Sequence, residues 1–149
     1  MSAILVDSNI LIYPHDPRDG TKQKIALDIL DRLIERNFAV LSVQCVTEFY
    51  RGVCWRLPQR LDPGIAIAQV ERLILACRIL SLTPQVVLEG CHGTIAHQLS
   101  YWDALIWASA KHNQVPHILT EDAEHGRVLE GVHFLDPFHP AFEMAMLEV

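Results

Sequence analysis

The chain has 149 residues, half of them apolar and 20% charged, and its formal net charge is −6. This composition excludes a disordered chain, and the length suits one domain with its own core. We expect neither a membrane span nor a signal peptide, because no uncharged apolar run is long enough and Asp7 interrupts the apolar start. The acidic balance excludes nucleic-acid binding by bulk charge, so such a partner would require cations or a local basic patch.

Apolar runs rich in branched residues alternate with segments of helical periodicity. Expected strands lie at residues 2–6, 38–43, 78–82, 117–119 and 132–135. Expected helices begin near residue 9 and continue at 22–36, 44–56, 62–77, 84–99 and 100–112, with a helical turn or two at 122–129. This alternation predicts an α/β fold: a three-layer α/β/α sandwich with a central parallel sheet of four to five strands. No linker or repeat interrupts it, so residues 1–149 are expected to form a single domain.

The four cysteines are scattered and form no Cys-x-x-Cys pair. Each of them has apolar neighbours: Cys45, Cys54, Cys77 and Cys91. We therefore expect free thiols in a reducing, cytoplasmic setting and no zinc site.

A few carboxylates stand in apolar surroundings beside the expected strand ends. Asp7 ends the first strand, Glu48 lies in the first turn or so after the second, Asp103 lies in the first turn of helix 100–112, and Asp122 follows strand 117–119. In an open parallel sheet, strands end and helices begin at the same edge, where ligands bind. These four carboxylates are therefore expected to converge. Glu89, in the middle of a helix, also has apolar neighbours but does not belong to this edge.

Each of these acids also has a local explanation. Asp7 or Ser8 could cap the first helix, and Ser100 with Asp103 fits a capping box. Thr120 could cap the turn that holds Asp122, while Glu48 could be a first-turn acid favoured by the helix dipole. The sequence therefore does not decide between these local roles and a shared site formed by the four acids.

Several carboxylates crowded at one edge repel one another and stay ionised only if cations are present. Oxygen ligands with retained water suit Mg²⁺ or Mn²⁺. Such ions activate water and neutralise charge on a phosphodiester under in-line attack. The residues alone therefore favour metal-assisted hydrolysis of a phosphoryl ester.

The ordered motifs carry a family resemblance that covers nearly the whole chain. They are Val6-Asp7-Ser8-Asn9, Thr47-Glu48-Phe49, Asp103-Ala104-Leu105 with the small residues after it, Leu119-Thr120-Glu121-Asp122, and Leu135-Asp136-Pro137-Phe138. Taken together, the chain resembles the PIN-domain ribonucleases, and among them the VapC-type toxins of bacterial toxin–antitoxin pairs. The resemblance implies a PIN-like sandwich and a nuclease that hydrolyses single-stranded RNA.

The resemblance also implies roles for particular residues. Mg²⁺ or Mn²⁺ would be held by Asp7, Glu48, Asp103 and Asp122, of which Asp7 and Asp103 are the firmest ligands. Asn9, Thr120 and the Ser8 hydroxyl would orient carboxylates or water. Glu121 is a possible substitute for Asp122. The implied partners are an RNA substrate, a cognate antitoxin and a second copy of the chain, in the cytoplasm.

Basic and aromatic residues near the acids could contact RNA. Arg51, Arg56 and Arg60 cluster around one expected helix end, with Arg56 and Arg60 as i,i+4 neighbours; they could follow an RNA backbone or form a solvated face. The three tryptophans could stack on bases. Trp107 is expected in the core, whereas Trp102, beside Asp103, could take either role.

Other functions remain as alternatives. A phosphatase or phosphotransfer domain could use a strand-end aspartate, but Asp7-Ser8-Asn9 lacks the second aspartate of a DxD pattern. A PIN-like binding module would be expected to lack the carboxylates, all four of which are here. A PIN-fold nuclease of RNA processing or decay also remains possible.

Overall fold

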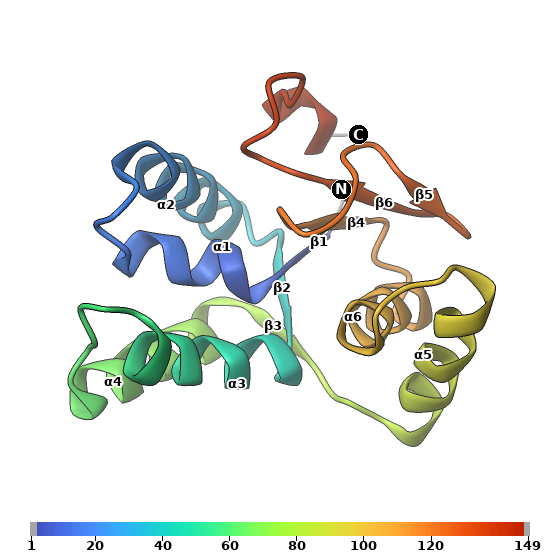
Figure 1. The fold of residues 1–149 in the computed structure, drawn as a ribbon, viewed down its shortest axis with the longest axis horizontal. Helices are drawn as coiled ribbons and strands as arrows, with labels where there is room; N and C mark the ends of the chain where they lie inside the picture. Colours follow the sequence, from blue (N-terminus) through green and yellow to red (C-terminus); the bar gives the residue numbers. More distant parts are fainter. Residues whose placement is uncertain (1–2, 148–149) are drawn as a thin grey trace.

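A six-stranded sheet runs through the middle of the molecule in the order β3–β2–β1–β4–β6–β5 (Figure 1). The computed structural model describes residues 3–147. The strands are β1 (Ile4–Val6), β2 (Ala39–Ser42), β3 (Arg78–Leu80), β4 (His117–Leu119), β5 (Val128–Leu129) and β6 (Val132–Leu135). All neighbouring strands pair in parallel except β5, which is antiparallel to β6. The five predicted parallel strands are confirmed; Ser2, assigned to the first of them, lies outside the described residues.

The segment 122–129 differs from its prediction. Instead of a helical turn or two, it forms a loop and the short strand β5, which joins β6 through a two-residue turn. Glu130 and Gly131 make that turn with φ values of 48° and 85°. Left-handed conformations at both central positions are typical of a tight hairpin, because the twist of such a turn matches the twist of the two strands that it joins. Hairpin pairing therefore replaces the expected helix.

Helices cover both faces of the sheet, with α1 to α4 on one side and α5 and α6 on the other (Figure 1). Their bounds are α1 (Ser8–Ile12), α2 (Gly20–Glu35), α3 (Val43–Arg51), α4 (Pro63–Ala76), α5 (Pro84–Ala96) and α6 (Tyr101–His112). Three short elements complete the list: η1 (Tyr13–His15), the π-helical turn η2 (Gly52–Arg56) and η3 (Met144–Leu147). The observed architecture confirms the predicted α/β/α sandwich.

Side-chain caps define where the helices begin. Each helix is preceded by an aspartate, serine or threonine whose side chain accepts a backbone N–H of the first turn: Asp7, Asp19, Ser42, Asp62, Thr83 and Ser100. Such caps satisfy N–H groups that have no partner inside the helix. For α1, α3 and α5, which follow strands, the caps fix the point at which the chain leaves the sheet and turns back.

The central strands form the core. Ile4, Leu5 and Val6 of β1 are fully buried, as expected for a parallel strand covered on both faces. Trp107 of α6 is 1% exposed, which confirms its predicted core position. All four cysteines are free thiols, also as predicted.

Two glycines of α5 explain the glycine-rich segment 89–93. A Cβ on Gly93 would lie 2.6 Å from the ring of Trp107, and one on Gly90 would lie 3.0 Å from the side chain of Leu105. The absence of these Cβ atoms lets α5 approach α6 closely. This approach supports α6, which carries Asp103 and Trp102.

We therefore predict that Gly93→Ala lowers the free energy of unfolding by about 1–3 kcal/mol, because the new methyl overpacks against a buried, rigid ring. Chemical denaturation with urea would measure the change. Gly20→Ala is the matched control, since nothing lies within 4 Å of a Cβ there and the substitution only favours the helix. Equal or greater stability of Gly93→Ala would contradict the close-packing explanation.

Candidate active site

Asp7 lies at the centre of the site, directly after β1. Its Oδ1 accepts the backbone N–H of Ser8 at 2.7 Å, and its Oδ2 accepts the hydroxyl of Thr120 at 2.8 Å. Asp7 is thus the N-cap of α1, so the local prediction is correct. The same carboxylate is 4% exposed and faces the other acids, so capping and a functional role are compatible.

Glu48 reaches the site from α3. Its Oε2 accepts the Ser8 hydroxyl at 2.7 Å, and its Oε1 accepts Gln44 Nε2 at 2.8 Å. The first turn of α3 contains no acid, so the expected first-turn position is wrong and a helix-dipole role does not explain this residue. Ser8, which lies next to Asp7, reaches Glu48 across 40 positions of sequence and so links the two acids. Gln44 was not singled out from the sequence because an isolated polar residue in a helix carries no motif.

Asp122 joins the site from the loop after β4. Asn9 Nδ2 donates to Asp122 Oδ2 at 3.0 Å and lies 3.4 Å from Asp7 Oδ2. The Thr120 hydroxyl oxygen also accepts the backbone N–H of Asp122 at 3.1 Å, which confirms the predicted cap. Asn9 and Thr120 therefore tie Asp122 to Asp7.

Asp103 faces the same place from the first turn of α6. Ser100 Oγ accepts the backbone N–H of Asp103 at 3.3 Å, so Ser100 is the predicted cap, but within residues 3–147 the reciprocal bond of a capping box, from Ser100 N–H to the Asp103 carboxylate, is not formed. Within residues 3–147, the Asp103 carboxylate has no hydrogen bond or ion pair. Its oxygens are therefore available to a ligand.

The four acids surround one cavity of about 400 Å³. An adjoining cavity of about 190 Å³ shares three of them, Asp7, Asp103 and Asp122. The sequence-based expectation that these carboxylates converge is met by the geometry. The cavity is also lined by Gln44, which carried no sequence motif.

The carboxylates of this cavity repel one another. Burial, opposed by the hydrogen bonds from Thr120 and Ser8 and assisted by the charges of Glu48 and Asp122, raises the pKa of Asp7 from 3.8 to about 6. Burial also raises the pKa of Asp122 above its ordinary value, although Asn9 opposes the shift. Across the part of the chain that is described, none of the ion pairs includes any of the four acids. Within residues 3–147, the four carboxylates therefore carry negative charge that no ion pair balances.

The donor set fits a hard divalent cation. The four carboxylates offer only oxygen atoms as ligands. Two amide oxygens, Asn9 Oδ1 and Gln44 Oε1, are also buried without a hydrogen-bond partner among residues 3–147. No three His, Cys, Asp or Glu side chains of that range converge closely enough to ligate an ion directly. Mg²⁺ usually keeps several waters and takes only one or two carboxylates directly, which suits this open arrangement.

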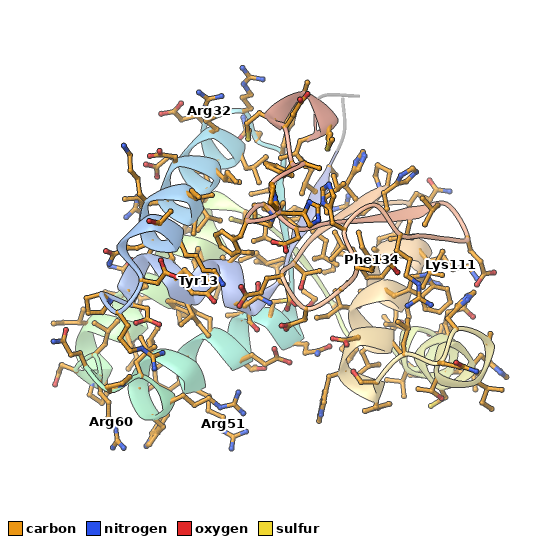
Figure 2. All side chains as sticks on the ribbon, turned by 45° about the horizontal axis from the view of Figure 1, so that its top comes forward. Tyr13, Arg32, Arg51, Arg60, Lys111 and Phe134 are labelled. Carbon is orange, nitrogen blue, oxygen red and sulfur yellow. The ribbon has the colours of Figure 1, made fainter. Side chains whose placement is uncertain are left out.

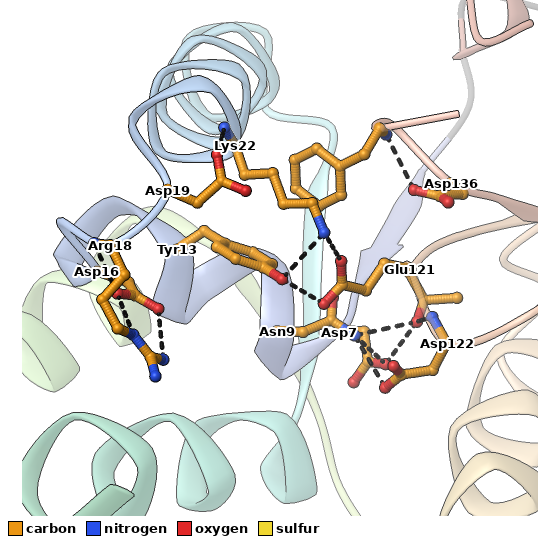
Figure 3. Close-up of polar contacts among 12 residues, drawn as sticks. Asp7, Asn9, Tyr13, Asp16, Arg18, Asp19, Lys22, Glu121, Asp122 and Asp136 are labelled. Atoms are coloured by element: carbon orange, nitrogen blue, oxygen red, sulfur yellow. Dashed lines mark hydrogen bonds and ion pairs between the residues drawn. The ribbon is translucent and has the colours of Figure 1, made fainter. Parts of the chain in front are cut away.

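Glu121 points elsewhere, although it precedes Asp122. Tyr13 Oη donates to its Oε1 at 2.5 Å, and Lys22 Nζ forms an ion pair with its Oε2 at 2.9 Å (Figure 3). Lys22 also lies 5.1 Å from the centre of the Phe138 ring. Glu121 does not line the acidic cavity, and these partners hold it away from the position of Asp122.

The basic residues separate into two groups. Arg51 and Arg56 line the cavity, and neither forms an ion pair or hydrogen bond with any residue in 3–147. In a π turn the i→i+5 hydrogen bonds place residues five apart on one face, so η2 brings Arg56 near the side that Arg51 occupies. The helix ends before Leu57, so the expected i,i+4 relation of Arg56 and Arg60 is wrong. Arg60 lies apart from Arg51 (Figure 2).

A family model for the PIN domain matches residues 4–130. The chain belongs to the PIN domain family. This result confirms the fold-family resemblance inferred from the motifs around Asp7, Glu48, Asp103 and Asp122. No curated protein sequence shows significant similarity to the chain.

Solved structures share the PIN fold of this chain at low identity. FitAcB from Neisseria gonorrhoeae is 24% identical, with a TM-score of 0.63 over 91% of this chain and 99% of that one. A toxin–antitoxin complex from Klebsiella pneumoniae is 18% identical, with a TM-score of 0.67 over 92% and 98%. VapC20 from Mycobacterium tuberculosis, a sarcin-ricin loop cleaving toxin, is 17% identical, with a TM-score of 0.60 over 78% and 87%.

Among residues 3–147, no helix combines the length and the apolar character needed to cross a bilayer.

The raised pKa of Asp7 predicts a pH-dependent effect of Asp7→Asn in EDTA. The pKa of Asp7 is about 6 in the folded protein and 3.8 in the unfolded chain. Ionisation of Asp7 therefore destabilises the fold as the pH rises between these two values. Asparagine does not ionise, so the variant should gain up to about 3 kcal/mol over the wild type above pH 6 and lose this gain below pH 4. Thermal melting between pH 4 and 8 measures the difference.

Glu89→Gln is the matched control, because Glu89 pairs with Lys111 outside the cavity. Its effect should not follow the Asp7 curve. Adding Mg²⁺ should stabilise the wild type more than Asp7→Asn. A difference between wild type and Asp7→Asn that is the same at every pH would refute the raised pKa.

Proposed function

We propose that this protein is a VapC-type ribonuclease, the toxin of a toxin–antitoxin pair, which hydrolyses phosphodiester bonds of single-stranded RNA with Mg²⁺ or Mn²⁺. One observation carries the proposal: Asp7, Glu48, Asp103 and Asp122 line one cavity, and no cationic side chain of residues 3–147 forms an ion pair with them. Such a cavity is suited to cations and to a reaction that develops negative charge. Cleavage of cellular RNA would take place in the cytoplasm.

The structural neighbours support this proposal. VapC20 is described as a toxin that cleaves the sarcin-ricin loop, and the Klebsiella pneumoniae structure is a toxin–antitoxin complex. Because the identities are low, this likeness shows the shared fold, and the carboxylates of this chain carry the proposal.

The residues of the cavity would have distinct roles as metal ligands and as groups that position those ligands. Asp7 and Asp103 are the principal ligands, with Glu48 and Asp122 completing the negative cavity. A bound Mg²⁺ or Mn²⁺ would supply an activated water and charge neutralisation at the phosphate. Ser8, Asn9 and Thr120 hold the carboxylates in place through the hydrogen bonds at 2.7–3.4 Å.

Outside the acidic ligands, two arginines are available for the substrate. Arg51 and Arg56 would bind RNA phosphates on either side of the bond to be cleaved. Their unpaired state within residues 3–147 leaves both guanidinium groups ready for that contact. They form the local basic patch that an acidic chain needs to bind RNA.

The partner proteins follow from the same features. An antitoxin would place a basic side chain among the four acids and thereby replace the charge of the metal. Helix α4 exposes four large apolar side chains, Ile65, Ile67, Ile74 and Leu75, and buries only Ala66. This helix provides a face for the antitoxin or for a homodimer.

Cleavage of end-labelled single-stranded RNA tests the proposal. We predict cleavage with Mg²⁺ or Mn²⁺, none in EDTA, and a loss of at least about 100-fold in Asp7→Asn and Asp103→Asn, since each removes a charged ligand. Glu89→Gln should cleave like the wild type.

The other outcomes decide between functions. Undiminished cleavage by both aspartate variants would place the activity outside this cavity. No cleavage of any RNA together with no Mn²⁺ binding would favour a non-catalytic PIN-like module. Cleavage without growth arrest on expression would favour an RNA-processing or decay nuclease.

A further inference from the structure

Trp102 is an exposed aromatic side chain at the mouth of the acidic cavity. It is 60% exposed, whereas Trp107 on the same helix is 1% exposed. It lines the cavity and directly precedes Asp103. A large aromatic surface left in water forgoes the stabilisation that burial would give, so an exposed tryptophan beside an active site suggests a ligand contact.

The backbone of Trp102 is held in place by the site itself. Gln44 Nε2 donates to the Trp102 carbonyl at 3.3 Å and to Glu48 Oε1 at 2.8 Å. The neighbouring ring of Tyr101 packs edge-on against the indole, with 5.2 Å between centroids. The Gln44 bonds tie the start of α6 to α3, and the Tyr101 contact lies within α6, while most of the indole stays uncovered.

Phosphate-binding groups belong to the same cavity. Arg51 and Arg56 are supplied by α3 and η2, whereas Trp102 is supplied by α6. The cavity volume of about 400 Å³ is in the range of small-ligand sites and can hold a nucleotide-sized group. The cavity therefore combines an aromatic surface, two free cations and the reactive carboxylates.

We propose that Trp102 stacks on an unpaired RNA base next to the bond that is cleaved, while Arg51 and Arg56 bind the flanking phosphates. This inference rests on the proposed ribonuclease function and names how the substrate is bound. A base in a duplex is already stacked on both faces, so the site selects single-stranded segments, loops or bulges. Stacking also contributes binding energy that is not weakened by the repulsion between phosphates and carboxylates.

A protein partner is the competing occupant of Trp102. The local chemistry favours RNA, because the indole adjoins Asp103 and shares its cavity with two unpaired arginines. The exposed apolar residues of α4 offer a protein partner a separate surface.

The test compares binding of a 12-nucleotide oligoadenylate with that of a 12-unit abasic ribose-phosphate chain. Both are fluorescently labelled, and binding is followed by anisotropy in Mg²⁺. The protein carries Asp7→Asn throughout, which suppresses cleavage and removes one repelling charge. Trp102→Ala should weaken oligoadenylate binding about 10- to 100-fold and leave abasic binding within about 2-fold, since only the former can stack.

Three further variants make the readout specific. Trp102→Phe should restore most of the oligoadenylate affinity, because a smaller ring still stacks. Trp55→Ala removes another exposed tryptophan, 55% exposed and outside the cavity lining, and should change neither affinity. Arg51→Gln should weaken binding of both chains to a similar extent, because both carry phosphates.

Unchanged oligoadenylate binding by Trp102→Ala would overturn the inference, as would an equal loss for both chains. If that variant instead loses affinity only for the antitoxin, Trp102 is a protein contact. Failure of the ribonuclease proposal is distinguishable, since it shows in the RNA-cleavage assay and not in the base dependence of binding.

Discussion

Electrostatic repulsion among four carboxylates at the carboxyl edge of a parallel sheet is the constraint on which the site depends. Asp7, Asp103 and Asp122 lie on walls shared by two adjoining cavities, and Glu48 completes the larger one. Gathering this charge weakens the fold unless a cation is present. The parallel topology makes the gathering possible, because β1 and β4 end at the same edge and α6 begins there.

Neutral hydrogen-bond donors hold the acids close together without cancelling their charge. Ser8 bridges Asp7 to Glu48, and Asn9 with Thr120 bridges Asp7 to Asp122. Lys22, whose partner Glu121 directly precedes Asp122, is instead occupied by Glu121 and Tyr13 (Figure 3). The arrangement therefore fixes the geometry of the carboxylates and leaves their charge for an external cation.

The fold and the acid cluster could be predicted from the sequence because both follow from local patterns. Buried strands such as Ile4–Val6 are continuous apolar runs, and three of the four acids, Asp7, Asp103 and Asp122, follow strand ends or lie in the first turn of a helix. Features set by tertiary context could not be predicted. The hairpin at Glu130–Gly131 overrode a weak helical pattern, and Lys22, 99 positions away, decided the direction of Glu121. The π turn that groups Arg51 with Arg56 also has no periodic signature in sequence.

The central claim is that the acidic cavity binds divalent cations through Asp7 and its neighbouring carboxylates. Anomalous diffraction from crystals of the antitoxin-free protein grown with Mn²⁺ tests it most directly. The account predicts an anomalous peak inside the cavity, within coordination distance of Asp7 or Asp103, which disappears in crystals of Asp7→Asn, Asp103→Asn double variants. An empty cavity at saturating Mn²⁺, with the four carboxylates in their metal-free positions, would contradict it.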